Sequence, residues 1–144
     1  MRTTLTTFAL ALAAAASFAQ TPAPVAASNC AEIEVTGLQA DTGTLNLASY
    51  DSSASYFKKP AWGERVKVVG TTMRIPVCNL AAGEIAVVGY QDLNDNKKMD
   101  KNPLGIPSEP YGASGTPPAF SAPTWDTTKV TWPPVADTVV KVKF

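Results

Sequence analysis

The order of apolar and polar residues along the chain predicts short β-strands. In most of these stretches apolar side chains alternate with polar ones, and this period of two is typical of strands with one buried face. Seven stretches have β character: residues 31–38, 44–50, 64–69, 72–78, 84–91, 129–132 and 137–144. The stretch 84–91 (EIAVVGYQ) is almost continuously apolar, which predicts a central strand buried on both faces.

Strands separated by turn residues, without an amphipathic helical pattern, predict an all-β fold. We expect a two-sheet antiparallel sandwich of the immunoglobulin-like or transthyretin-like kind. Its predicted core contains Val35, Leu47, Val68, Ile75, Val87 and Val142. Pro76 has no backbone N–H for the strand ladder, so residues 72–78 should form an edge strand or carry a bulge. In the irregular segment 51–63, we expect Phe57 to be the apolar anchor.

The N-terminus has the layout of a secretory signal peptide. Arg2 precedes an uncharged, mostly apolar run, and small residues at Ser17 and Ala19 suit cleavage after Ala19. The run is shorter than the roughly 20 apolar residues of a transmembrane helix. We therefore expect a signal peptide at 1–19, a Pro- and Ala-rich flexible lead-in at 20–29, and one domain at 30–144, exported to the periplasm or cell exterior.

The cysteines, the charge balance and the lack of His narrow the possible sites and partners of the exported chain. Cys30 and Cys78 form an even pair, which predicts a disulfide in an oxidising compartment. The chain has 12 basic and 12 acidic residues and no basic block, which argues against nucleic acid as a partner. It has no His, so catalytic triads with His and His-ligated metal sites are excluded.

A segment rich in Pro, Gly, Asn, Asp and Ser, residues 92–124, is too long for a simple connector and begins with a possible metal loop. Asp92, Asn94, Asn96 and Asp100 occupy positions 1, 3, 5 and 9, the spacing of the first nine positions of an EF-hand loop. These side chains, with the backbone carbonyl of Lys98, would supply oxygens to Ca²⁺.

Two positions depart from that loop. Lys97 stands at the sixth position, where the EF-hand uses Gly, and Pro103 at the twelfth, where it uses Glu. Glu109 would have to fold back to supply the missing carboxylate. The alternative is a metal-free loop held by Asx-turns, whose carboxylates are solvated or paired with nearby lysines.

Three neighbouring motifs resemble a bacterial family catalogued as domain of unknown function 2141. They are LAAGEIAV (80–87), YQDLNDNKKMD (90–100) and LGIPSEPYG (104–112). The resemblance covers nearly the whole mature chain. It implies an exported β-sandwich without an assigned activity. The chain departs from the family pattern at Lys97, where Gly is usual, and at Ala113, where an aromatic residue is common.

The function predicted from these observations is a non-catalytic binding or structural module outside the cytoplasm. Its partner would be a protein or glycan, and its one suggested cofactor is Ca²⁺. An alternative is a carbohydrate- or peptide-binding accessory domain that uses Trp62, Trp125 and Trp132 as a platform. Burial of these tryptophans would favour a packing role instead. An oxygen-ligated metal hydrolase is a third alternative, although no nucleophile–base pair is evident. The sequence does not indicate the oligomeric state.

Overall fold

A computed structural model describes residues 30–119, 121–134 and 139–144 of the chain. The predicted signal peptide and lead-in lie outside the described residues. The elements are β1 (Cys30–Thr36), β2 (Thr44–Tyr50), β3 (Trp62–Lys67), β4 (Thr72–Cys78), β5 (Gly83–Asp92), β6 (Tyr111–Ala113), α1 (Trp125–Thr128), β7 (Lys129–Trp132) and β8 (Val140–Lys143). Within these ranges, no helix is long and apolar enough to cross a membrane.

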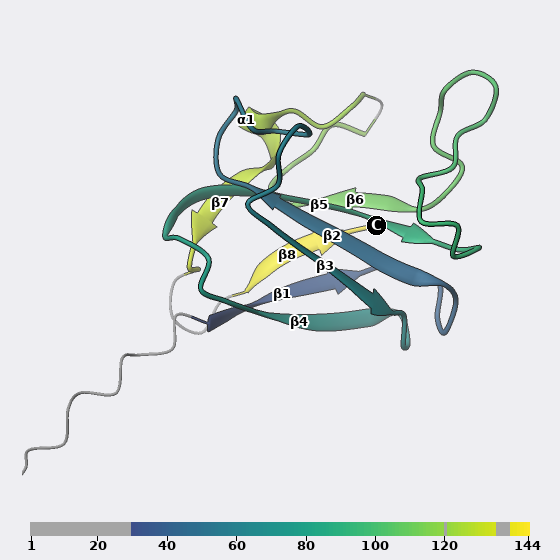
Figure 1. Ribbon diagram of the computed structural model, residues 1–144, viewed down its shortest axis with the longest axis horizontal. Coiled ribbons are helices and arrows are strands. Elements are labelled where there is room, and N and C mark those ends of the chain that lie inside the picture. The colour runs from purple at the N-terminus through teal and green to yellow at the C-terminus, as the bar shows by residue number, and fades with distance from the viewer. Residues whose placement is uncertain (1–29, 120, 135–138) are drawn as a thin grey trace, which may run out of the picture.

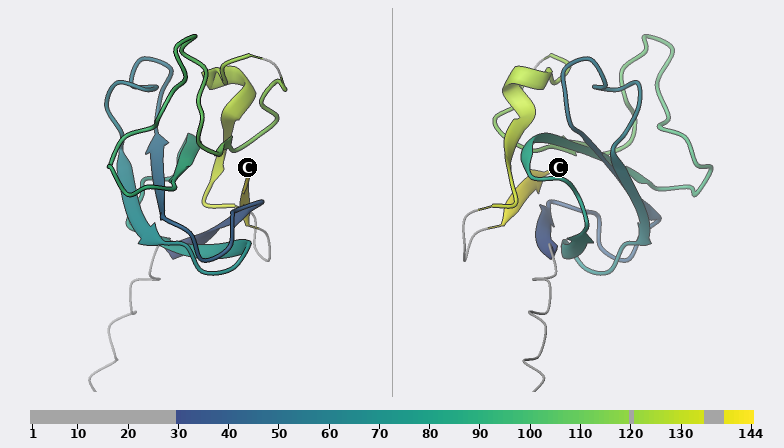
Figure 2. Two further views of the ribbon diagram at one scale, coloured as in Figure 1. Left: turned by 90° about the vertical axis from the view of Figure 1, so that its right-hand side faces the viewer. Right: turned by 60° about the vertical axis from the view of Figure 1, so that its left-hand side comes forward.

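The eight strands of the described residues join into one hydrogen-bonded sheet. Its order is β3-β2-β5-β6-β8-β1-β4, and β7 pairs with β5 outside this path. The sheet curls into half of a barrel, with β2 and β3 on one side of the core and β1 and β4 on the other (Figure 1, Figure 2). The predicted all-β class is confirmed, but the division into two separate sheets is not. The reason is β6, which pairs with both β5 and β8 and so carries the hydrogen bonding around the curve.

The positions of β5 and β4 in the sheet are those that the sequence predicted. β5 is central, because it pairs with β2, β6 and β7. β4 lies at the end of the sheet and pairs with β1, where Pro76 stands opposite Glu32. One pairing was not expected: β1 and β8 run parallel, with Ile33 opposite Val140.

Both faces of the β2–β5 region are packed, which explains the continuous apolar run in β5. All six residues of the predicted core lie in the main buried cluster, inside the curl: Val35, Leu47, Val68, Ile75, Val87 and Val142. On the outer face, Tyr50, Val88 and Ala113 form a smaller cluster, with Tyr56 and Trp125 packed against it.

Two short elements in and after the long segment 92–124 were not predicted. β6 has three residues and α1 has four. Neither is long enough to show a repeat of two or of 3.6 residues. The last strand begins at Val140, later than the predicted residue 137, and residues 135–138 lie outside the described part.

The predicted partners Cys30 and Cys78 are bonded to each other in the structure. Their Sγ atoms are 2.04 Å apart and their Cα atoms 4.0 Å apart. They are also register partners in the antiparallel β1–β4 pair, so the disulfide joins the start of β1 to the end of β4. The pairing agrees with the disulfide predicted from the sequence.

Candidate functional site

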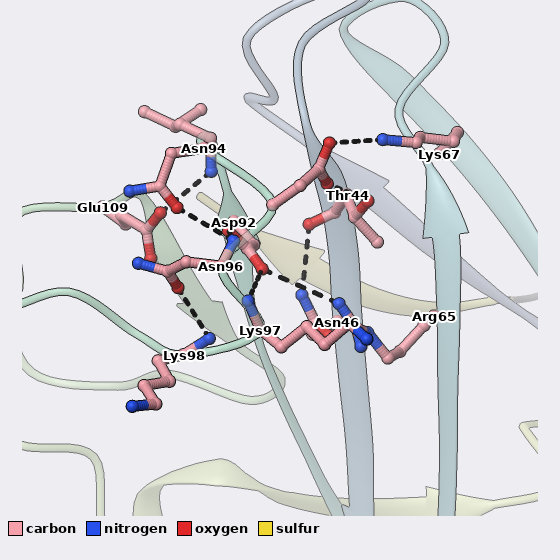
Figure 3. A network of polar contacts seen from close by, with 12 residues as sticks. Thr44, Asn46, Arg65, Lys67, Asp92, Asn94, Asn96, Lys97, Lys98 and Glu109 are labelled. Atoms are coloured by element: carbon pink, nitrogen blue, oxygen red, sulfur yellow. Dashed lines mark hydrogen bonds and ion pairs between the residues drawn. The ribbon is translucent and has the colours of Figure 1, made fainter.

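The 92–100 loop begins with a carboxylate that is completely buried. Asp92 ends β5, and its side chain is 0% exposed. Its Oδ1 accepts the N–H of Asn96 at 3.0 Å and its Oδ2 accepts the N–H of Lys97 at 2.7 Å (Figure 3). The Arg65 guanidinium on β3 lies 3.7 Å from Oδ2. Asp92 therefore folds the following residues back over the end of its own strand.

The two asparagines close the middle of the loop. Asn94 Oδ1 accepts the N–H of Asn96 at 3.0 Å, and Asn96 Oδ1 accepts the N–H of Lys98 at 2.9 Å. These are Asx-turns, which Asn forms readily. The Nδ2 groups of both asparagines donate to the Asp100 carboxylate, at 2.7 Å from Asn94 and 2.9 Å from Asn96. These hydrogen bonds lower the pKa of Asp100, with the Asn96 bond the larger cause.

Glu109 folds back onto the loop and accepts hydrogen bonds from its backbone. Its side chain is buried, with 6% exposure. Oε1 accepts the N–H of Leu93 at 2.9 Å and Oε2 accepts the N–H of Asp100 at 3.0 Å. One carboxylate thus joins the two ends of the loop through backbone N–H groups.

Contacts with β2 and β3 hold the loop from outside, and the sequence analysis missed them. Thr44 Oγ1 and Lys67 Nζ both donate to the Asp95 carboxylate, and they lower its pKa, with the Lys67 bond the larger cause (Figure 3). Gly43 has a φ of +63°, and a Cβ there would lie 2.0 Å from the carbonyl oxygen of Asp92. Only Gly allows this approach between the turn before β2 and the loop.

The loop shares one backbone feature with an EF-hand loop, but the oxygens of its predicted ligands already accept hydrogen bonds. Lys97 takes a φ of +69°, the left-handed conformation for which EF-hand loops use Gly. The predicted oxygen ligands Asp92, Asn94, Asn96, Asp100 and Glu109 all lie in this one network. Each accepts hydrogen bonds within the loop. Over the described ranges, no group of three or more His, Cys, Asp or Glu side chains is arranged to hold a metal ion.

After the loop, residues 100–108 form a small hairpin. Lys101 and Pro107 are bridge partners, and the N–H of Ser108 donates to the carbonyl of Asp100 at 2.9 Å. At the tip, the Asn102 side chain accepts the N–H groups of Leu104 and Ile106 at 2.9 and 3.0 Å. In Figure 1 the chain between β5 and β6 stands away from the sheet at the upper right.

A groove of about 860 Å³ lies between the hairpin and the sheet. Its floor is formed by β2, β5 and β6, including Ala48, Val88 and Tyr90. Its walls come from the hairpin, from Phe57 and from residues 119 and 121–123. Most lining side chains are apolar or aromatic, and Lys101 is the one charged residue among the lining residues that the structure describes. Phe57, Ile106 and Tyr111 are large, exposed apolar side chains of this groove.

The tryptophans do not gather into the platform that the alternative carbohydrate- or peptide-binding function would need. Trp132 is 1% exposed in the main core, and Trp62 packs against the same cluster. Trp125 packs against the outer cluster, edge-on to Tyr56 at 6.2 Å between ring centroids. Their positions favour packing, the outcome that the sequence analysis set against ligand binding.

Tyr56, not Phe57, anchors the segment between β2 and β3. Tyr56 is half-buried, and its hydroxyl is 3.1 Å from Thr128 Oγ1 on α1. The next residue, Phe57, has a φ of +55° and is 56% exposed. The prediction of Phe57 as the anchor is wrong, because Tyr56 combines a ring with a hydroxyl that reaches α1 and so takes the inner position.

Comparison with known proteins gives one family and two partial relatives. The DNA-binding protein HU 2 of Streptomyces coelicolor is 35% identical over 82 residues, and so is that of Streptomyces lividans. Each match covers 56% of this chain and 34% of the relative, so the chain spans about a third of the length of these relatives. No solved structure matches the chain. A family model described as "Uncharacterized protein conserved in bacteria (DUF2141)" matches residues 33–140, and the chain therefore belongs to this family.

Proposed function

We propose that this protein is a non-catalytic, exported binding module whose ligand surface is the groove over β2, β5 and β6. The observation that carries the proposal is an open, mainly apolar groove of about 860 Å³. This size lies within the range of roughly 300–1,000 Å³ typical of small-ligand sites. Exposed apolar side chains gathered on one surface are typical of binding sites, and Phe57, Ile106 and Tyr111 gather here.

The groove lining favours binding over catalysis. Its titratable side chains are Lys101 and the tyrosines, and among the described residues no hydrogen bond or ion pair joins two of them into a nucleophile–base pair. The carboxylates at the base of the loop, Asp92 and Glu109, are buried and accept backbone N–H groups. They are therefore poorly placed as bases, which argues against a metal hydrolase.

The lining favours an apolar ligand over a sugar. Carbohydrate sites combine aromatic faces with many hydrogen-bonding side chains, whereas this groove has Met99, Ile106 and Val88 beside its tyrosines. DNA is not proposed as a ligand, although two partial relatives carry DNA-binding names. The chain has as many acidic as basic residues, 12 of each, and DNA binding depends on an excess of positive charge.

The closed loop has a structural part in this proposal. Asp92 and Glu109 hold its two ends at the sheet, and the hairpin that carries Lys101 and Ile106 starts where the loop ends. Because this base is rigid, the groove wall is in place before a ligand binds. Binding then does not have to order the wall, and this improves the affinity.

Binding of a neutral solvatochromic dye such as Nile red tests the proposal. We expect the folded protein to bind the dye, and Ile106→Asp to weaken binding because it puts a charge in the groove. Leu104→Asp is a matched control, since Leu104 is an exposed aliphatic residue of the same hairpin, 83% exposed, that does not line the groove. Equal dye binding by the two variants would contradict the proposal, as would no binding by the unmodified protein.

A second proposal is that the 92–100 loop binds Ca²⁺ weakly. In its favour, all the predicted ligands lie in one network and Lys97 has the left-handed backbone of a calcium loop. Binding requires Asn94 and Asn96 to turn their amide oxygens toward Asp100 and give up present hydrogen bonds. We therefore expect a Kd in the range of about 10⁻⁴–10⁻³ M, like that of extracellular modules.

Thermal unfolding of chelator-treated protein tests the calcium proposal. The melting temperature should rise with Ca²⁺ and hardly with Mg²⁺, whose octahedral shell suits such a loop poorly. Asp100→Ala should remove the rise, and Asp126→Ala should not, because Asp126 lies on α1 outside the loop. A melting curve that does not move at about 5 mM Ca²⁺, above the expected Kd, would exclude the metal.

A further inference from the structure

We propose that the groove binds anionic amphiphiles, molecules with an apolar body and one carboxylate, and that Lys101 contacts the carboxylate while Phe57 covers the apolar body. This inference rests on the proposed binding function and specifies its ligand class. It is carried by two observations that are independent of each other: the charge of the groove and the backbone of Phe57.

Among the described residues, the groove lining has one charged side chain, and that side chain forms no ion pair with the others. Lys101 is the one charged lining residue, and none of the ion pairs found among the described residues includes it. Its backbone is held by the bridge to Pro107, which also lines the groove. An otherwise apolar site with one free cation is complementary to an apolar ligand with one anion. A cationic ligand would be repelled by Lys101, and a neutral ligand would gain no charge interaction from it.

Phe57 keeps an unfavourable backbone conformation in an exposed position. A φ of +55° is disfavoured for a bulky residue, because its Cβ crowds the following carbonyl. The turn is held by backbone bonds, including Lys58 N–H and Lys59 N–H to the carbonyl of Ser55 at 2.8 and 2.9 Å. Gly would fit this φ better, yet the position has an aromatic ring that is 56% exposed. The ring packs against Tyr56 and Tyr50, with centroids 4.4 and 5.8 Å away, and so is held at the groove. Backbone strain of this kind is frequent at ligand-binding positions, and it fits a ring that covers a ligand.

Lys101 and Phe57 join the groove from opposite ends of its floor. Asn46 on β2 pairs with Tyr90. The N–H of the next residue, Gln91, donates to the carbonyl of Pro110, just after the hairpin that carries Lys101. Tyr50, four residues further along β2, has its ring centroid 5.8 Å from that of Phe57. Four residues of strand span roughly 13 Å. A ligand that contacts both residues is therefore elongated, with its charge beside the hairpin and its apolar part beside Tyr50.

The test compares three ligands that share a 12-carbon chain: dodecanoate, dodecanol and dodecylammonium. Each is used below its aggregation concentration. Its binding is measured by displacement of Nile red from the full mature protein. We expect dodecanoate to bind most tightly and dodecylammonium most weakly. Lys101→Met should weaken dodecanoate about threefold to fivefold, the size of an exposed ion pair, and leave dodecanol unchanged. Lys98→Met, at an exposed lysine of the neighbouring 92–100 loop outside the groove, should change neither.

Variants at Phe57 test the second contact. Phe57→Gly should weaken dodecanoate and dodecanol together by roughly tenfold or more, the value of burying an aromatic ring. Its melting temperature should move by no more than about a few degrees, because relief of the left-handed backbone offsets the lost ring contacts. Phe57→Asn, which also tolerates this φ, should behave the same way.

The outcomes separate this inference from the proposed function. If all three ligands bind equally, or if Lys101→Met binds dodecanoate like the unmodified protein, the anionic class is wrong while the groove remains a binding site. If the Phe57 variants bind normally, its part in the contact is wrong. If neither the dye nor any of the three ligands binds, the proposed function itself fails.

Discussion

Replacing Asp92 by Asn removes one negative charge from the base of the loop with almost no change in shape. In the unmodified protein the two oxygens of this buried carboxylate accept the N–H groups of Asn96 and Lys97 at 3.0 and 2.7 Å. Asn has one oxygen and one NH₂ group, so it can accept only one of these bonds. The other backbone N–H would then face the NH₂ group of Asn, which is also a donor, in a position that solvent does not reach.

The expected loss follows from these contacts. A hydrogen bond to a charged group is worth about 1.5–3 kcal/mol, and a buried donor without a partner costs about 1–3 kcal/mol. The two terms overlap, since they describe the same contact. The Arg65 guanidinium at 3.7 Å adds at most about 1 kcal/mol, because its side chain is 44% exposed to solvent. We therefore expect Asp92→Asn to lower the free energy of unfolding by about 2–4 kcal/mol, a large part of the roughly 5–15 kcal/mol of a typical domain.

Urea unfolding in the presence of a chelator measures this loss. The midpoint should fall while the m-value stays constant, because the surface exposed on unfolding does not change. Asp126→Asn is the control, since that side chain is 85% exposed and its nearest cation is 3.9 Å away. A change below about 0.5 kcal/mol, the level of ordinary surface substitutions, would refute the structural role of Asp92. A loss that appears only with Ca²⁺ present would show that the residue acts as a metal ligand instead.

Three further predictions concern the contacts around the loop and the sheet edge. Gly43→Ala should destabilise the fold and lower the urea concentration at the midpoint of unfolding, because the added Cβ would meet the Asp92 carbonyl oxygen at 2.0 Å. An unchanged midpoint would contradict this packing. Lys67 and Thr44 lower the pKa of Asp95 in the folded state, so the ionised Asp95 carboxylate stabilises the fold. This stabilisation should be present above the ordinary pKa of 3.8 and should be lost as the pH falls below it. Asp95→Asn should therefore flatten the acid limb of a plot of melting temperature against pH, and an unchanged limb would refute the assignment. Reduction of the Cys30–Cys78 disulfide should lower the free energy of unfolding by on the order of 4 kcal/mol, given a closed loop of roughly 50 residues, and the Cys30→Ser, Cys78→Ser double variant should show the same loss without reductant.

The amino-acid sequence alone determined every strand except β6, the inward residues of these strands and several of their places in the sheet. Period-two alternation located Val35 and Leu47 in the core, because each side chain's face depends only on its position within its own strand. The apolar run of β5 and the missing N–H of Pro76 indicated a central and an edge strand for the same local reason. The spacing of Asp92, Asn94, Asn96 and Asp100 also indicated a closed polar loop, which the structure has.

The tertiary structure decided how the strands join and where the groove lies. The single curled sheet depends on β6, whose three residues have no detectable pattern and become a strand only through pairing with β5 and β8. The groove combines Phe57 with Ile106, and the loop base combines Gly43 with Asp92; both pairs are far apart in sequence. Such pairs depend on the register between distant strands, whereas a sequence pattern reports only the face on which each residue lies. That is the physical reason why the core was predictable and the proposed binding surface was not.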